Sequence, residues 1–215
     1  MANITLADRL GNFTEITADR GRLDNRPSDL EYAISKYARP HSHVIIYTKR
    51  GYILVQERQE SKRLAGGLRF PIHGGHVSET DILEAVKRGK RPKYAYLIGA
   101  VRELGPAPDG ELGLIVKEDE LRPVANKYFR ENEIPILDYN TFVKIFDVIY
   151  DREKHGTLKR FNQAEIKDVY PLTVQDAERD KLFAQFGPKL GGFLLNHVKQ
   201  TSFKIRHLGY EHVLR

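Results

Sequence analysis

Hydrophobic and polar positions alternate along the chain in several stretches that are typical of β-strands. Residues 43–49 (HVIIYTK) and 52–57 (YILVQE) are rich in β-branched and aromatic side chains, which favour an extended backbone. The Arg50-Gly51 pair between them is a turn signal, so the two stretches predict a β-hairpin. The same kind of pattern predicts further strands over residues 68–72, 141–150 and 164–173.

Apolar residues at helical spacing mark the predicted helices. Ser28 and Glu31 form a capping-box pattern, and a short amphipathic helix is expected over residues 29–38, before Pro40. Three further helices are predicted over residues 81–88, 94–104 and 190–198.

The two ends of the chain give weaker patterns. Residues 1–27 are polar and contain turn-forming residues, which predicts a loosely structured lead-in. A helix over residues 176–186 is expected to end at Gly187-Pro188, since proline breaks a continuing helix. Residues 199–215 carry the most one-sidedly basic stretch of the chain.

Strands with helices between and after them, in mixed order, predict an α/β fold with a mixed sheet flanked by helices. No segment has the composition of a linker between two hydrophobic sets. We therefore expect an N-terminal extension with a short helix over residues 1–40, followed by one domain over residues 41–215 that includes the C-terminal helices.

Composition limits the chemistry. The chain contains no cysteine, which excludes disulfides, thiol nucleophiles and thiolate metal sites. No apolar run approaches the roughly 18 residues that a membrane helix needs, so a cytoplasmic protein is expected. The formal net charge of +6 favours anionic partners such as phosphate esters, nucleotides or nucleic acid, although 29 acidic residues among 35 basic ones also fit an ordinary mixed surface.

An ordered series of motifs runs through two thirds of the chain. Its members are ILVQERQESK at 53–62, GGLRFPIHGGHV at 66–77, AVREL at 100–104, ELGL at 111–114, YFREN at 128–132, TFVKIFDVIYD at 141–151 and AEIKDVYPLTVQDAE at 164–178. In this order they resemble the Nudix hydrolase superfamily, and especially its isopentenyl-diphosphate-isomerase-like branch. The resemblance implies a Nudix-like mixed sheet sandwiched between helices, with an N-terminal extension and a helical C-terminal region.

The segment that resembles the Nudix box, G-x5-E-x7-R-E-U-x-E-E-x-G-U, is interrupted twice. Asp81 stands where the family has its first glutamate, and 20 residues separate it from Arg102, where the family has a shorter spacer. In the second interruption, 7 residues lie between Leu104 and Leu112, where the family has a shorter spacer, and two of them are prolines. Because proline breaks a helix, Glu111 is not expected on the helix face of Glu103 unless the loop folds back.

The resemblance implies attack of water on a diphosphate, assisted by Mg²⁺ or Mn²⁺. Glu103 matches the glutamate of the R-E-U motif and is the candidate catalytic residue and metal ligand. Glu111 and Glu165 are the other candidate ligands, since carboxylate oxygens are what such cations prefer.

The candidate substrate-binding residues follow from the same resemblance and from phosphate chemistry. They are Arg58, Lys62, Arg63, Gly75 and Arg102. Arginine suits a phosphate because its guanidinium donates two parallel hydrogen bonds, and a glycine lets the backbone approach closely. The expected partner is a small phosphorylated substrate, cleaved at a diphosphate linkage in a nucleotide or a related metabolite.

Two alternatives stay open. The interrupted box is also compatible with an inactive Nudix-fold module that binds a phosphorylated ligand, or with a nucleic-acid-associated domain whose binding weakens with salt. The isomerase reaction of the resembled branch is not expected, because it relies on a cysteine where this chain has Pro71-Ile72-His73. The sequence does not indicate an oligomeric state or a role for the inserted residues 86–99.

Four histidines are further candidate metal ligands. His41 and His43 precede the first predicted domain strand or lie at its start, and His73 and His76 flank the paired glycines. Imidazoles at such spacings fit a zinc site, with polar loop histidines as the alternative.

Overall fold

The computed structural model describes residues 3–62, 66–158 and 161–213. In that part of the chain, seven strands form one mixed sheet with the central order β5-β4-β3-β8-β7, while β6 pairs with β3 and β9 pairs with β4. Their bounds are β3 (Arg39–Thr48), β4 (Ile53–Arg58), β5 (Arg69–Phe70), β6 (His73–His76), β7 (Arg122–Phe129), β8 (Thr141–Tyr150) and β9 (Ile166–Leu172). The two long central strands β3 and β8 run parallel, and the other pairs are antiparallel. The predicted α/β class with a mixed sheet is confirmed.

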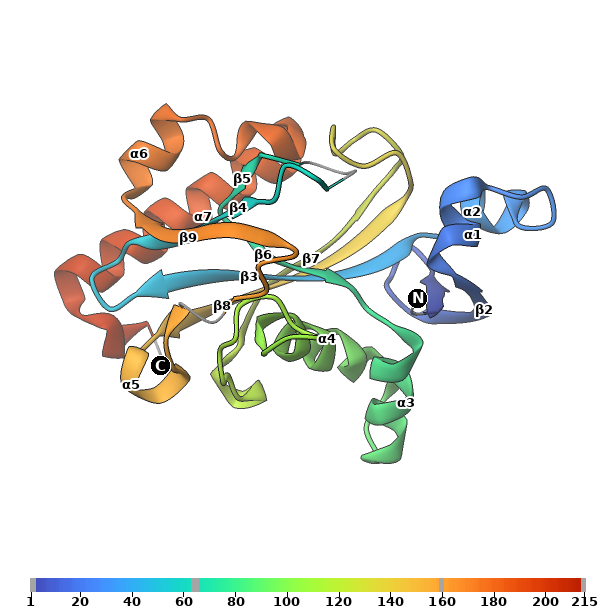
Figure 1. Ribbon diagram of the computed structural model, residues 1–215, viewed down its shortest axis with the longest axis horizontal. Coiled ribbons are helices and arrows are strands. Elements are labelled where there is room, and N and C mark those ends of the chain that lie inside the picture. Colours follow the sequence, from blue (N-terminus) through green and yellow to red (C-terminus); the bar gives the residue numbers. More distant parts are fainter. Residues whose placement is uncertain (1–2, 63–65, 159–160, 214–215) are drawn as a thin grey trace.

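Helices cover both faces of this sheet (Figure 1). The helices α6 (Val174–Arg179) and α7 (Gly187–Leu208) lie on one face, and α3 (Glu79–Lys87) and α4 (Ala95–Leu104) lie on the other. The short helix α5 (Arg152–His155) follows β8, and 3₁₀ turns cover Pro92–Tyr94, Glu118–Glu120, Ala184–Phe186 and Tyr210–His212. Among the described residues, no helix is both long and apolar enough to cross a membrane.

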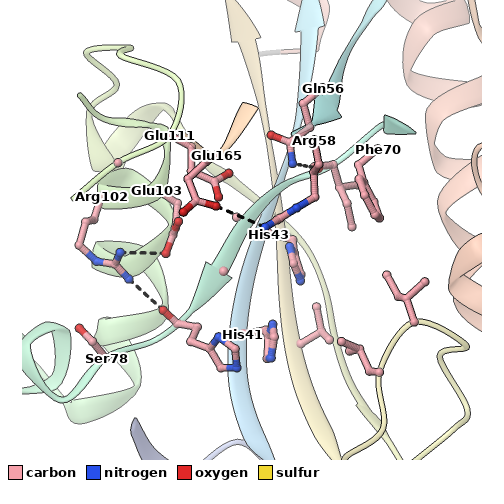
Figure 2. Close-up of a pocket in the computed structure, with 18 of the residues that line it drawn as sticks. His41, His43, Gln56, Arg58, Phe70, Ser78, Arg102, Glu103, Glu111 and Glu165 are labelled. Carbon is pink, nitrogen blue, oxygen red and sulfur yellow. Dashed lines mark hydrogen bonds and ion pairs between the residues drawn. The ribbon is translucent and has the colours of Figure 1, made fainter. Parts of the chain in front are cut away.

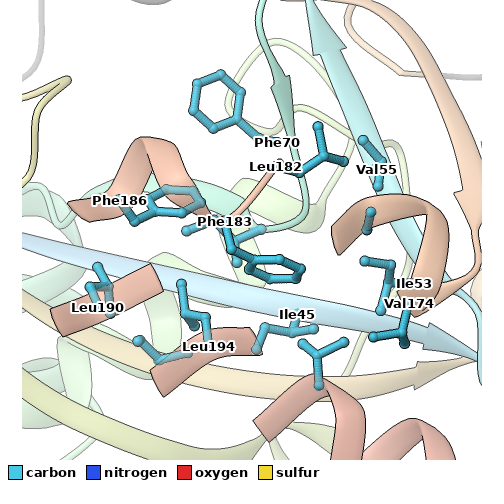
Figure 3. Packing of buried hydrophobic residues seen from close by; sticks show 14 of the residues in the cluster. Ile45, Ile53, Val55, Phe70, Val174, Leu182, Phe183, Phe186, Leu190 and Leu194 are labelled. Atoms are coloured by element: carbon cyan, nitrogen blue, oxygen red, sulfur yellow. The ribbon is translucent and has the colours of Figure 1, made fainter. Parts of the chain in front are cut away.

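Alternation along β3 divides the core between the two faces. Ile45 and Tyr47 pack in the cluster under α7, whereas Val44 and Ile46 pack in the cluster that includes α4. All four are fully buried, as the period of two along a strand requires when both faces are covered. Figure 3 shows the first cluster, in which Leu194 of α7 lies close to Ile45. Each such side chain contributes about 1.5–3 kcal/mol through burial.

The predicted end of a helix at Gly187-Pro188 is wrong. The structure has the short α6, a 3₁₀ turn over Ala184–Phe186, and then a long helix α7 that begins at Gly187 and runs to Leu208. Proline is favourable at the first helical position, where its missing N–H has no partner to lose. The basic tail is therefore helical over much of its length.

The prediction of a loose lead-in is also wrong. Residues 1–27 contain the hairpin β1 (Asn3–Ala7) and β2 (Phe13–Asp19), followed by α1 (Arg20–Asn25), and the predicted helix over 29–38 is the shorter α2 (Glu31–Lys36). These elements share a small cluster of their own, built on Ile4, Leu6, Ala18, Leu23, Ala33 and Ile34. They lie at one end of the sheet, beside the start of β3 (Figure 1).

The strand patterns give a mixed result. The strand over 141–150 is confirmed as β8 to the residue, and the hairpin of β3 and β4 is confirmed, although β3 starts earlier than expected. Strand β7 carries little apolar periodicity because it pairs only with β8 and its side chains are mostly half-buried or exposed. The residues expected as one strand over 68–72 contribute only the two-residue β5.

Candidate active site

A cavity of about 670 Å³ opens where the sheet extends beyond the start of α7. Its walls come from β3, β4, β6, the loop after α4 and the segment before β8. Figure 2 shows acidic side chains on one side of this cavity and histidines below them. Six of the predicted site residues line it, Lys62 pairs with one of these six, and Arg63 lies outside the described residues.

The loop that interrupts the Nudix-like box folds back onto the helix before it. The backbone N–H of Glu111 donates to the carbonyl of Glu103 at 2.8 Å, and the N–H of Leu114 donates to the carbonyl of Leu104 at 2.8 Å. Glu103 is in the last turn of α4, so these bonds bring Glu111 beside it despite the prolines. Glu165 arrives from the other direction, immediately before β9, and lines the same cavity.

Basic residues pair with two of the three carboxylates. Arg102 Nη1 donates to Glu103 Oε1 at 2.8 Å. Arg58 Nη2 lies 3.4 Å from Glu165 Oε2, and Lys62 also pairs with Glu165. Arg58 therefore lines the cavity, and Lys62 lies beside it through its pair with Glu165.

Glu111 has no such partner among the residues that the structure describes. Its Oε2 is buried and accepts no hydrogen bond from the described residues. Burial, and next the negative charge of Glu103, raise the pKa of Glu111 to about 8. Burial also raises the pKa of Glu103, against the opposing effect of Arg102. A cation that enters the site would stabilise the ionised form of this buried carboxylate.

The donor set fits Mg²⁺ or Mn²⁺. The side chains supply hard carboxylate oxygens, and one buried oxygen of Glu111 lacks a partner. As the side chains lie, the described part of the chain has no group of three His, Cys, Asp or Glu residues close enough to hold a metal ion. Because Mg²⁺ keeps several water ligands and needs few from the protein, Glu103, Glu111 and Glu165 are the residues that would hold it.

Glycines of β6 leave the space for these groups. A Cβ built on Gly75 would lie 2.8 Å from Glu103 Oε1, and a Cβ on Gly74 would lie 2.1 Å from the carbonyl oxygen of Ser42. Gly74 also has a φ of +140°, which side chains rarely adopt. Gly75 therefore positions Glu103 by the absence of a side chain.

The four histidines are not loop residues, so that interpretation is wrong. His41 and His43 lie on β3, and His73 and His76 lie on β6. Within the described chain no group suited to a metal ion includes them, which gives the zinc alternative no support. The ring nitrogens of His73 face other protein atoms: they lie 3.2 Å from Gln56 Oε1 and 3.0 Å from the carbonyl oxygen of Leu54.

His41, His43 and His76, together with Tyr139, form what we call the histidine wall of the cavity. The rings of His41 and His76 are 4.1 Å apart between centroids, and those of His41 and His43 are 5.6 Å apart. Tyr139 Oη lies 3.3 Å from His41 Nε2 and 3.4 Å from His76 Nε2. The sequence patterns do not identify Tyr139 as a site residue. The spacing of two between His41 and His43 does indicate that both could lie on one face of a strand.

Comparisons with known proteins give the fold. No protein-family model matches the chain, and no curated protein matches it. Among solved structures, the protein DR0079 of Deinococcus radiodurans aligns with a TM-score of 0.50 at 19% identity, over 92% of this chain and 98% of its own. Tm1382, whose name gives Nudix hydrolase as a provisional assignment, aligns with a TM-score of 0.50 at 15% identity, over 90% and 98%. The chain has a Nudix fold.

A third solved structure shares this Nudix fold over part of its length. It is a bifunctional NMN adenylyltransferase/ADP ribose pyrophosphatase of Francisella tularensis, complexed with AMP and a manganese ion. It aligns with a TM-score of 0.52 at 12% identity, over 85% of this chain and 47% of the larger protein. At these identities the likeness concerns the fold, and the isomerase-like branch stays a prediction from the motifs.

Proposed function

We propose that this protein is a divergent Nudix-type hydrolase that cleaves a diphosphate linkage in a nucleotide or related metabolite, with Mg²⁺ or Mn²⁺. The observation that carries the proposal is the meeting of Glu103, Glu111 and Glu165 at one end of the cavity, with one buried oxygen of Glu111 unpaired. A buried carboxylate without a partner destabilises the folded protein. Such destabilising groups are found most often at functional sites.

Each side chain has a role in this proposal. Glu103, Glu111 and Glu165 would hold the metal, which when bound neutralises phosphate charge and acidifies water. Glu103 would also accept a proton from the attacking water, because its raised pKa brings it closer to neutral pH.

The cations would exchange partners on substrate binding. Arg58 and Lys62 now share Glu165, and a phosphate offers them the same kind of oxygen with more charge. Arg102 pairs with Asp81 as well as with Glu103. It would therefore hold Glu103 in place and lie at the edge of the phosphate site. Gly75 lets the substrate approach the strand backbone.

The test is release of phosphate or nucleotide from a panel of diphosphates, with and without Mg²⁺ or Mn²⁺, combined with calorimetric titration of each metal. Glu103→Gln is expected to reduce the rate by 100-fold or more, on the order of what loss of a general base costs. Glu178→Gln, in an exposed ion pair with Lys199, is the matched control and should keep full activity. Equal hydrolysis by wild type and Glu103→Gln would refute the assignment.

One observation favours a second candidate, an inactive module that binds a phosphorylated ligand. Glu103 and Glu165 are paired with internal cations, and no ready-made metal group exists in the described residues. The same experiment separates the two: a binding module takes up a diphosphate through Arg58 and Lys62 but releases no product and shows no metal titration. Binding of nucleic acid through the basic C-terminal residues remains an expectation, tested by its salt dependence.

A further inference from the structure

The inward face of β3 changes character along its length. Positions 45 and 47 are Ile and Tyr, packed under α7, while positions 41 and 43 on the same side are both histidine. The change occurs where the strand enters the cavity, which His41 and His43 line (Figure 2). Packing alone would be met by aliphatic side chains at both positions, so the imidazoles need another explanation.

His43 shows that the wall is incomplete by itself. Its Nδ1 is buried and has no hydrogen-bond partner among the described residues. Buried polar atoms in proteins almost always have a partner, and an exception points to a ligand or an ordered water. Its cross-strand neighbour is Gly74, which has no side chain that could offer a partner.

The hydrogen bonds of Tyr139 leave one hydrogen-bond donor and one acceptor on the rings of His41 and His76. Its hydroxyl lies within hydrogen-bond reach of His41 Nε2 and His76 Nε2, and it has one proton to give. One of these imidazoles therefore accepts from Tyr139 and the other donates to it. In neutral imidazoles the Nδ1 atoms then have opposite roles, one carrying a proton and one a lone pair. Burial lowers the pKa of His41, His43 and His76, which keeps the rings uncharged at neutral pH.

Apolar side chains also line the cavity beside this wall, together with the polar side chains of Arg20 and Gln56. Phe70, Ile72 and Phe186 line the same cavity and are themselves buried, and the rings of Phe70 and Phe186 meet edge to face at 6.0 Å between centroids. A hydrogen-bonding wall with aromatic and aliphatic side chains in the same cavity suits a flat ring with apolar faces and polar edges.

Strand β6 joins this wall to the acidic end of the cavity. Gly75 approaches Glu103, Gly74 pairs with His43, and His76 pairs with His41. The two regions are therefore neighbouring parts of one cavity.

We propose that the histidine wall is a specificity subsite that binds an uncharged, hydrogen-bonding ring attached to the diphosphate, through His43 and the Tyr139 network. This inference rests on the proposed function for the diphosphate end. It selects against substrates whose non-phosphate part is an apolar chain, because such a chain leaves the polar atoms of the wall unpaired.

Binding, rather than turnover, is the direct test. The probes are the four common ribonucleoside diphosphates, inorganic diphosphate and dimethylallyl diphosphate, each titrated calorimetrically into Glu103→Gln in the presence of Mg²⁺. We expect at least one nucleoside diphosphate to bind about tenfold more tightly than inorganic diphosphate, equivalent to about 1.4 kcal/mol. Dimethylallyl diphosphate binding as tightly as the best nucleoside diphosphate would overturn the inference.

Variants of the histidine wall then test whether its residues cause the preference for a nucleoside diphosphate over inorganic diphosphate. His43→Leu and Tyr139→Phe should each reduce the preference at least severalfold while leaving the affinity for inorganic diphosphate unchanged. His207→Leu, at an exposed position on α7, is the matched control. Tyr139→Phe removes one oxygen only, so it carries the test if His43→Leu does not fold. A full preference in Tyr139→Phe and in any folded His43→Leu would overturn the inference.

Nucleosides without phosphate separate this inference from the proposed function. They are titrated into the wild type while the ring signals of its 8 histidines are followed by NMR. Shifts of His43 that Tyr139→Phe weakens, without any metal-dependent hydrolysis, would support the subsite and count against the hydrolase. Hydrolysis that depends on Glu103, with no nucleoside-induced shift of His43, would support the hydrolase and overturn the subsite.

Discussion

Asp81 and Arg102 form a two-point ion pair although 20 residues lie between them in the sequence. Arg102 Nε lies 3.1 Å from Asp81 Oδ1, and Arg102 Nη2 lies 3.1 Å from Asp81 Oδ2. Asp81 is almost completely buried and also caps the start of α3 with Ser78. Asp81 is in α3 and Arg102 is in α4, and the inserted residues connect these two helices. The ion pair therefore keeps the two ends of the interrupted box together.

Loss of this pair should cost about 2 kcal/mol of unfolding free energy, because Asp81 is buried and Arg102 would keep Glu103 as its only acidic partner among the described residues. The measurement is urea unfolding of Asp81→Asn, Arg102→Gln and the double variant, which isolates the coupling energy. The control is the exposed pair Glu84–Arg88 on α3, whose coupling should stay below about 0.5 kcal/mol. Equal coupling in the two pairs would show that Asp81 acts only as a helix cap.

Gly75→Ala should disable the acidic end of the cavity without unfolding the protein. The added Cβ would lie 2.8 Å from Glu103 Oε1, so the carboxylate has to move away from Glu111 and Arg102. We expect metal affinity to fall at least tenfold in calorimetry, since a ligand displaced by about 1 Å loses its geometry. Gly192→Ala on α7 has open space and should be neutral or stabilising by up to about 1 kcal/mol. Unchanged metal affinity in Gly75→Ala would show that Glu103 is not a ligand.

The central sheet was predictable because its signals are local. The apolar runs of β3 and β8 identify strands by themselves, since both faces of these strands are buried. The N-terminal hairpin was missed because its few buried residues, such as Ile4 and Leu6, stand among polar ones and pack only with each other. The start of α7 was missed because Gly187-Pro188 begins a helix as readily as it ends one.

The site was predictable in residue type but not in arrangement. Motif order singled out Glu103, Glu111 and Glu165, yet only the backbone bond from Glu111 N–H to the Glu103 carbonyl shows how the broken box closes. Tyr139 lies 98 residues from His41 in the sequence, and no local pattern connects them. Contacts of this kind depend on the pairing of strands and are invisible to periodicity.

The buried histidines should destabilise the protein in mild acid. Burial lowers the pKa of His43 to about 4 and that of His73 to about 4, from 6.5 for an ordinary histidine. Between these values the unfolded chain binds more protons than the folded one, so stability falls as pH drops from about 6.5 towards 4. The loss should be on the order of a few kcal/mol in total.

Chemical unfolding at a series of pH values measures this slope. His43→Gln should make it shallower, because one group no longer takes up a proton on unfolding. His207→Gln, at an exposed position, should leave the slope unchanged. An identical slope in His43→Gln would mean that His43 is protonated inside the folded protein.

Glu111 should act in the opposite direction at higher pH. Its folded pKa is raised to about 8 from 4.5, chiefly by burial and next by Glu103. Between these values the folded chain binds more protons than the unfolded one, so this group makes stability fall as pH rises from about 4.5 to about 8. Without metal, Glu111→Gln should therefore be more stable than wild type at pH 8 by on the order of a few kcal/mol, with the gain shrinking towards pH 5.

The same variant exposes the conflict between stability and function at this site. Thermal melting of wild type and Glu111→Gln at pH 5 and pH 8 checks the sign, and Glu178→Gln is the exposed control. Saturating Mg²⁺ should then raise the melting temperature of wild type at pH 8 and leave that of Glu111→Gln nearly unchanged, because a ligand that binds only the folded state stabilises it. A Glu111→Gln protein that is less stable than wild type at pH 8 without metal would show that the Glu111 carboxylate already has a partner, and the argument for a metal at this position would fail.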